Sequence, residues 1–139
     1  MVAGVGIRDD ANLGQPDGDG GAIRVRLLGP MAVWRDGVEQ ALPASRKARS
    51  LFAYLALAQL PLPRSRLCEL LWETPRDPRG ELRWSLSKIR GLVDGPQRRV
   101  IARDDTIRLD LAACAVDALE VARAVESGLE TLPRGELQA

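Results

Sequence analysis

The spacing of apolar residues changes twice along this chain, and this change constrains the fold more than any other feature. In residues 23–42 apolar and polar residues alternate, as in "IRVRLLG", which is typical of half-buried strands. In residues 45–93 they recur at helical spacing, and in residues 98–111 the alternation returns. The pattern predicts an α+β fold: an N-terminal three-stranded antiparallel sheet, three helices and a C-terminal β-hairpin.

Turn and capping residues divide these regions into elements. Asp36-Gly37 is a strong hairpin signal between "MAVWR" and "VEQAL". Ser45 is a typical N-cap for a first helix that continues to about residue 58. A second helix is expected to begin after Ser65, with three leucines facing inward: Leu67, Leu70 and Leu71. Asp77-Pro78 predicts the start of a third helix, since proline suits the first helical position.

The third helix has two unlike faces on a helical wheel of about 100° per residue. One narrow stripe is apolar and is expected to face the core: Leu82, Leu86, Ile89 and Val93. The other side carries Arg83, Trp84, Ser87, Lys88 and Gly91. A tryptophan on the face meant for water indicates that this face contacts a partner.

The remaining segments predict a hairpin, a further helix and a tail. "RRVIAR" and "TIRLDL" are expected to pair across a turn at Asp104-Asp105. From residue 116, apolar residues at helical spacing open another helix: Leu119, Ala122, Val125 and Leu129. Residues 1–21 are rich in Gly and Asp, which predicts a disordered tail. We therefore expect a tail over 1–21, a domain over 22–112, and the start of an all-helical domain over 116–139.

Composition disfavours enzyme, metal and membrane functions. The chain has no histidine, and Cys68 and Cys114 are far apart with no C-x-x-C, so no metal site, catalytic constellation or cofactor is expected. Neither phosphate-binding glycine motif occurs. No apolar run approaches the roughly 18 residues of a membrane span, and the N-terminus does not resemble a secretory signal. We expect a cytoplasmic, non-enzymatic protein.

The net charge of +1 conceals an uneven distribution of charges. Residues 1–21 and 114–139 each carry a net charge of −3, which leaves 17 basic and 10 acidic residues, net +7, in residues 22–113. A basic central region between acidic ends is typical of a protein that binds a polyanion.

Four segments in this order resemble a known family of DNA-binding domains: "SRKARSLFAYLALA", "SRLCELLW", "ELRWSLSKIRGLV" and "TIRLDL". They are similar to the OmpR/PhoB-type winged helix-turn-helix domain, and most of all to the version in SARP-type antibiotic-regulatory activators. "IRVRLLGPMAVWRDG" fits the opening strands of that family, and "AVDALEVARAV" resembles the start of the bacterial transcriptional activation domain. The resemblance covers about residues 22–127.

The resemblance implies a transcriptional activator that binds double-stranded promoter DNA, often as a head-to-tail dimer, and recruits RNA polymerase. The third helix then enters the major groove. The loop between the second and third helices corresponds to the segment that faces the polymerase in such proteins: Glu73, Arg76, Asp77 and Arg79. The activation domain needs more residues than follow Val116, so we expect a fragment of a larger protein.

Within this arrangement the residues divide by expected role. Base readout is assigned to the outer face of the third helix: Arg83, Trp84, Ser87 and Lys88. Phosphate contact is assigned to the start of the first helix, the edge of the third and the hairpin: Ser45, Arg46, Lys47, Arg49, Arg90, Arg99 and Arg103. Arg64 and Arg66 are weaker candidates, and a solvated charged face is the alternative for all of them.

Two residues depart from the pattern of the family. Relatives usually carry a polar residue, often Gln, where this chain has Trp84. Three explanations remain open for this ring. It contacts a thymine methyl or sugar edge, or it packs against a dimer partner or the helical domain. In the third explanation, base readout at this position has been lost. Glu81 repels phosphate, yet it can accept a hydrogen bond from cytosine or favour the helix dipole. A protein-interaction or autoinhibitory module of a larger regulator is therefore the alternative to a DNA reader.

Overall fold

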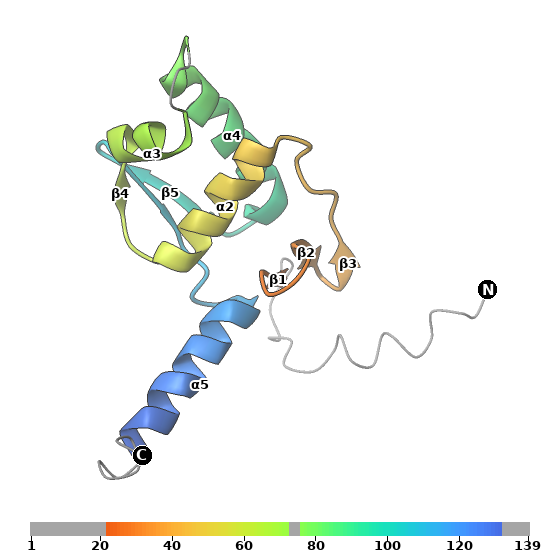
Figure 1. Ribbon diagram of the computed structural model, residues 1–139. Helices are drawn as coiled ribbons and strands as arrows, with labels where there is room; N and C mark the ends of the chain where they lie inside the picture. Colours follow the sequence, from red (N-terminus) through yellow and green to blue (C-terminus); the bar gives the residue numbers. More distant parts are fainter. Residues whose placement is uncertain (1–21, 73–75, 132–139) are drawn as a thin grey trace, which may run out of the picture.

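Four helices and two small sheets form the part of the chain that the computed structural model describes, residues 22–72 and 76–131 (Figure 1). The fold is mixed α+β, as the sequence predicts. One buried apolar core joins both sheets to the helices, and its largest members include Ile23, Phe52, Leu67, Leu86, Ile107 and Leu111. No helix in the described ranges has the length and apolar character that crossing a membrane requires.

The first sheet has the strand order β3-β2-β1-β7. Its strands are β1 (Ile23–Arg26), β2 (Ala32–Arg35), β3 (Val38–Glu39) and β7 (Ala115–Val116). The three predicted antiparallel strands are confirmed, and the turn at Asp36-Gly37 has φ values of +51° and +82°, as a tight hairpin requires. The sequence did not predict β7, which pairs with β1 in parallel. Val116 was expected to begin a helix, but it lies in this strand and is buried.

Three helices follow the first three strands: α2 (Arg46–Ala58), α3 (Arg64–Leu71) and α4 (Pro78–Val93). Both predicted N-caps are confirmed, because Ser45 Oγ accepts from Ala48 N at 3.2 Å and Asp77 Oδ1 accepts from Gly80 N at 3.0 Å. The prediction that Leu70 faces inward is wrong, since 47% of it is exposed. On this short helix Leu67 and Cys68 define the buried face, and Leu70 points away from it.

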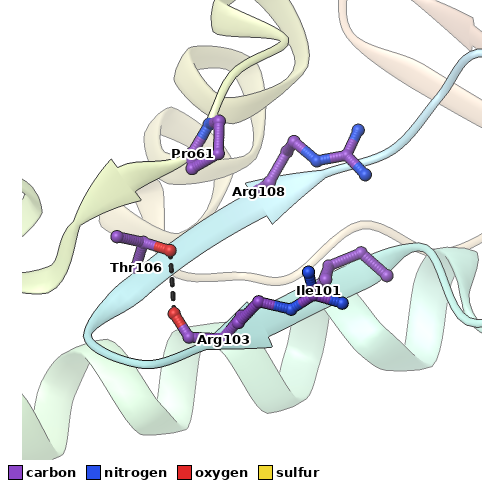
Figure 2. A pocket seen from close by; sticks show the side chains of 5 residues that line it. All are labelled: Pro61, Ile101, Arg103, Thr106 and Arg108. Carbon is purple, nitrogen blue, oxygen red and sulfur yellow. Dashed lines mark hydrogen bonds between the residues drawn. The ribbon is translucent and has the colours of Figure 1, made fainter.

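The second sheet contains the predicted hairpin. Its order is β4-β6-β5, with β4 (Leu62–Pro63), β5 (Val100–Arg103) and β6 (Thr106–Leu109). The strands of the hairpin are shorter than the sequence predicts, and the sequence did not predict β4. Figure 2 shows the outer face of this sheet, where Arg103, Arg108 and Ile101 line a shallow hollow of about 120 Å³ with Pro61 and Thr106.

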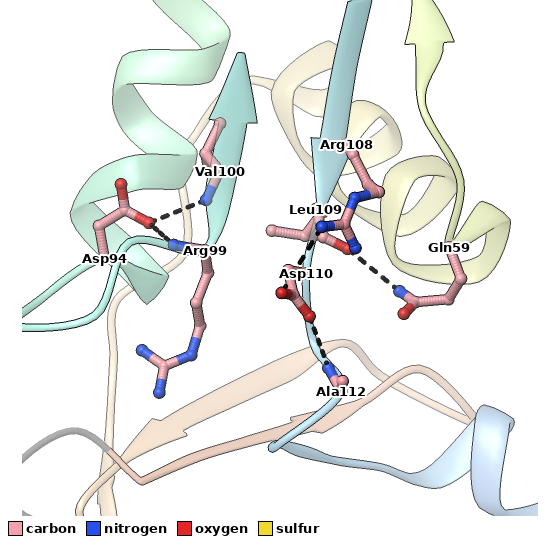
Figure 3. A network of polar contacts seen from close by, with 8 residues as sticks. All are labelled: Gln59, Asp94, Arg99, Val100, Arg108, Leu109, Asp110 and Ala112. Carbon is pink, nitrogen blue, oxygen red and sulfur yellow. Dashed lines mark hydrogen bonds and ion pairs between the residues drawn. The ribbon is translucent and has the colours of Figure 1, made fainter. Parts of the chain in front are cut away.

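Two arginines hold the carboxyl end of α4. Arg35 Nη2 from β2 donates to the backbone carbonyls of Leu92 at 2.7 Å and Asp94 at 2.9 Å. Arg99 Nη1 donates to the carbonyl of Val93 at 2.7 Å. A guanidinium group suits this end of a helix because its last carbonyls lack intrahelical partners and carry partial negative charge. The Asp94 carboxylate accepts from the backbone N–H groups of Arg99 and Val100, so α4 is fixed directly to β5 (Figure 3).

The last helix, α5 (Asp117–Thr131), extends away from the other helices (Figure 1). Its first residue anchors it, because the Asp117 carboxylate accepts from the backbone N–H groups of Leu27 at 2.8 Å and Leu28 at 3.1 Å. Leu119 packs against the core. Farther along, Val121, Val125 and Leu129 are about half exposed.

Cys114 gives the fold a predicted sensitivity to alkaline pH. Burial raises the pKa of its thiol above the ordinary value of 9.0, and the nearby Arg99 guanidinium offsets part of this effect. The folded chain therefore retains the thiol proton at pH values where the unfolded chain has lost it, so the free energy of unfolding falls as pH rises above about 9. We expect a shallower alkaline decline in Cys114→Ala than in the wild type, measured by urea unfolding at neutral pH and above pH 9.0. Identical declines in the two proteins would contradict this prediction.

Candidate nucleic-acid interface

Helix α4 presents one apolar and one polar face, as its sequence predicts. Its buried side chains are Leu82, Ser85, Leu86, Ile89, Leu92 and Val93. All four residues predicted to read bases are exposed: Arg83, Trp84, Ser87 and Lys88. The buried face contacts α2, α3 and both sheets, so the exposed face is held on a rigid support.

Contacts among three of these residues order the middle of the exposed face. Lys88 Nζ lies 5.2 Å from the centroid of the Trp84 ring, in cation–π contact. Ser87 Oγ donates to the backbone carbonyl of Trp84 at 2.7 Å. Trp84 remains 47% exposed, so a large aromatic surface and an adjacent ammonium group are available together to a partner.

A hollow of about 230 Å³ lies where α3, α4 and the β5–β6 turn meet. Its lining residues are Arg64, Arg79, Leu82, Arg83 and Asp105. Arg79 Nη1 lies 3.6 Å from Asp105 Oδ1 in an ion pair whose side chains are both more than half exposed. At this hollow, the start of α4 therefore lies next to the turn of the hairpin.

The predicted phosphate contacts at the start of α2 have unequal surroundings. Arg46 is exposed. Lys47 is also exposed, but its Nζ donates to the backbone carbonyl of Leu71 at the end of α3. Arg49 Nη1 donates to the carbonyls of Pro43 and Ala44, each at 2.8 Å. Ser45 uses its hydroxyl oxygen as the N-cap. Arg46 is thus the member of this group best suited to an outside phosphate.

Assignment of Arg99 to phosphate contact requires correction. The residue is only 6% exposed, and its guanidinium group holds the end of α4. The sequence predicted Arg99 within a strand of the hairpin, whereas it precedes β5 and its guanidinium group points inward. Arg103 is exposed at the end of β5, and Arg90 is partly exposed at the edge of α4.

Three of the four residues predicted to face the polymerase are described, and two of these belong to the start of α4. Glu73 lies outside the described residues. Arg76 is exposed, but Asp77 caps α4 and Arg79 belongs to its first turn. Because Arg79 pairs with Asp105, it contributes to the hollow beside the hairpin.

Sequence reasoning missed the grouping of Arg64 and Arg79 with Asp105. The Asp104-Asp105 pair was interpreted as a turn, which is confirmed by the pairing of Arg103 with Thr106 and by a φ of +55° at Asp104. No local pattern relates residues 64, 79 and 105, because their proximity results from tertiary packing. Glu81, a further acidic residue near this end of α4, is exposed in the first turn.

The arrangement offers groups that bind anions and aromatic rings. Among residues 22–72 and 76–131, no three metal-ligating side chains of the His, Cys, Asp or Glu type are grouped closely enough to hold an ion. Guanidinium, ammonium and indole groups dominate the exposed surface of α4, and these groups recognise phosphates and bases. No protein-family model matches the sequence, and no curated protein matches it.

Proposed function

We propose that this chain is a winged helix-turn-helix module of a transcription regulator that binds double-stranded DNA in a sequence-specific way. In this proposal α3 and α4 form the helix-turn-helix, α4 enters the major groove, and the β5–β6 hairpin is the wing. One observation carries the proposal: the exposed face of α4 combines Arg83, Trp84 and Lys88, and it begins beside the hairpin turn.

Each exposed group has a role suited to its chemistry. Arg83 is assigned to guanine, whose N7 and O6 accept both donors of a guanidinium fork. Trp84 is assigned to a thymine methyl or sugar edge, with Lys88 above its ring directed to a base or phosphate. Arg46 and Arg103 are assigned to phosphates on either side. The net charge of +7 over residues 22–113 favours association with a polyanion.

Selection from a random duplex library across a series of salt concentrations tests this function. We expect one enriched sequence, bound with an affinity that falls as salt rises because several phosphate contacts displace counterions. A set of unselected duplexes is the control. Weak, salt-sensitive binding to all duplexes alike would contradict sequence-specific recognition.

A protein-interaction module is the second candidate, and Trp84 favours it. An aromatic residue that is 47% exposed is also typical of an interface with protein, and the Glu81 carboxylate in the first turn of α4 repels phosphate. Loss of protein binding in Trp84→Ala, together with an unselective DNA library, would favour this candidate. Recruitment of RNA polymerase and head-to-tail dimerisation remain predictions of the resemblance.

A further inference from the structure

The hollow between α3, α4 and the β5–β6 turn has the chemistry of an anion site. Three guanidinium groups and one carboxylate line it, so positive charge exceeds negative charge. We propose that this hollow binds one phosphate group through Arg64 and Arg79, and that Asp105 pairs with Arg79 in the free chain and competes with the phosphate. The proposal rests on the proposed function only for the source of the phosphate, the backbone of duplex DNA.

Main-chain contacts join two walls of the hollow, the start of α3 and the hairpin turn. The backbone N–H of Arg64 donates to the carbonyl of Asp105 at 2.9 Å. Directly before it, Pro63 pairs with Thr106 across β4 and β6. The start of α3 is therefore bonded directly to the hairpin turn. A site whose walls are fixed in advance loses little conformational entropy when it binds an anion.

The ion pair between Arg79 and Asp105 is weak enough to be displaced. Its atoms are 3.6 Å apart and both side chains are largely exposed, and pairs of this kind contribute little to stability. A phosphate presents more acceptor oxygens and more negative charge than one carboxylate, and it suits the guanidinium fork. Arg79 can thus exchange Asp105 for a phosphate without loss of a strong internal contact.

The position of Arg83 explains why a phosphate here serves sequence recognition. Arg83 lines the same hollow from the next turn of α4. A DNA phosphate held by Arg64 and Arg79 fixes the distance between the DNA backbone and α4, and Arg83 then meets the adjacent base edge. Phosphate contacts of this kind set the register of a protein on duplex DNA but carry no sequence information themselves.

Inorganic phosphate tests the site without DNA. The arginine Nε–H resonances are followed by NMR while phosphate replaces chloride at constant ionic strength. We expect saturable shifts at Arg64 and Arg79, lost in Arg79→Gln and retained in Arg123→Gln, an exposed control on α5, which contributes no residue to the hollow. Shifts at Arg64 and Arg79 no larger than those at Arg123 would overturn the proposal, whether or not the chain binds DNA.

A second experiment measures DNA binding, and the two variants of the ion pair are expected to change the affinity in opposite directions. Arg79→Gln is expected to weaken binding to all duplexes alike and to reduce the salt slope by about one. Asp105→Asn is expected to strengthen binding, because it removes the competing carboxylate. The wild type is expected to bind more weakly to a duplex in which one neutral methylphosphonate replaces the contacted phosphate. The affinity of Arg79→Gln is expected to be unchanged by this replacement. Equal weakening in both variants would identify the ion pair as a structural brace and would overturn the phosphate site.

Discussion

Arg99→Met is expected to lower the free energy of unfolding by about 2–3 kcal/mol, the scale of a buried hydrogen bond to a charged group. Methionine retains an apolar side chain of similar length but removes the donor to the Val93 carbonyl at the end of α4. That carbonyl then lacks this partner in a buried setting, where water replaces it poorly. The residue is 6% exposed, so solvent screening does not reduce the effect greatly.

Arg98→Met is the matched control. Arg98 is adjacent to Arg99 in the sequence and has the same charge, but its side chain is exposed. Its effect on stability is expected to remain within about 0.5 kcal/mol, as is usual for surface substitutions. Both variants are measured by urea unfolding, and DNA binding is measured at a temperature where both are folded. If Arg99→Met unfolds like the wild type but binds DNA more weakly, the guanidinium has an external role and its structural assignment is wrong.

Features that depend on neighbouring residues were predicted well from the sequence. The Asp36-Gly37 hairpin and the caps at Ser45 and Asp77 are local, since each requires only a side chain or a φ value within a few residues. The stripe on α4 is also local, because helical geometry alone groups Leu82 with Leu86. These are the features that the structure confirms.

Features set by distant pairing could not be predicted. The strands β4 and β7 have two residues each, too few to show any period. Proline cannot donate a hydrogen bond to a sheet, yet Pro63 is tolerated in β4 because that strand lies at the edge of its sheet. Burial of Val116 depends on pairing with β1, about ninety residues earlier in the chain.

The net charge misled the site prediction in one specific way. A sum over residues 22–113 counts every arginine equally, but several guanidinium groups bond to carbonyls of the protein itself: Arg26, Arg35, Arg49 and Arg99. Arg24 lies over the Trp34 ring, with 4.2 Å between its guanidinium carbon and the ring centroid. A guanidinium group serves internal carbonyls as well as external phosphates, so the sequence alone does not separate the two uses.

Arg83→Ala is expected to reduce discrimination between the selected sequence and its single-base variants by about 1–3 kcal/mol, the value of one good bidentate base contact. The side chain is exposed on α4, so its removal leaves the apolar stripe and the fold intact. The loss should be confined to one base pair of the selected site, because a guanidinium group can pair with one guanine. Competition binding with each single-base variant measures it.

Arg46→Ala is the better control for a phosphate contact than Lys47→Ala, because Lys47 also holds the end of α3. Removing Arg46 should weaken binding to every duplex alike and leave discrimination unchanged, since phosphates are the same in all sequences. Equal losses on all duplexes from both Arg83→Ala and Arg46→Ala would remove Arg83 from base readout. Discrimination would then depend on Trp84 and Lys88, whose contact on the exposed face of α4 makes Trp84→Ala the next variant to measure.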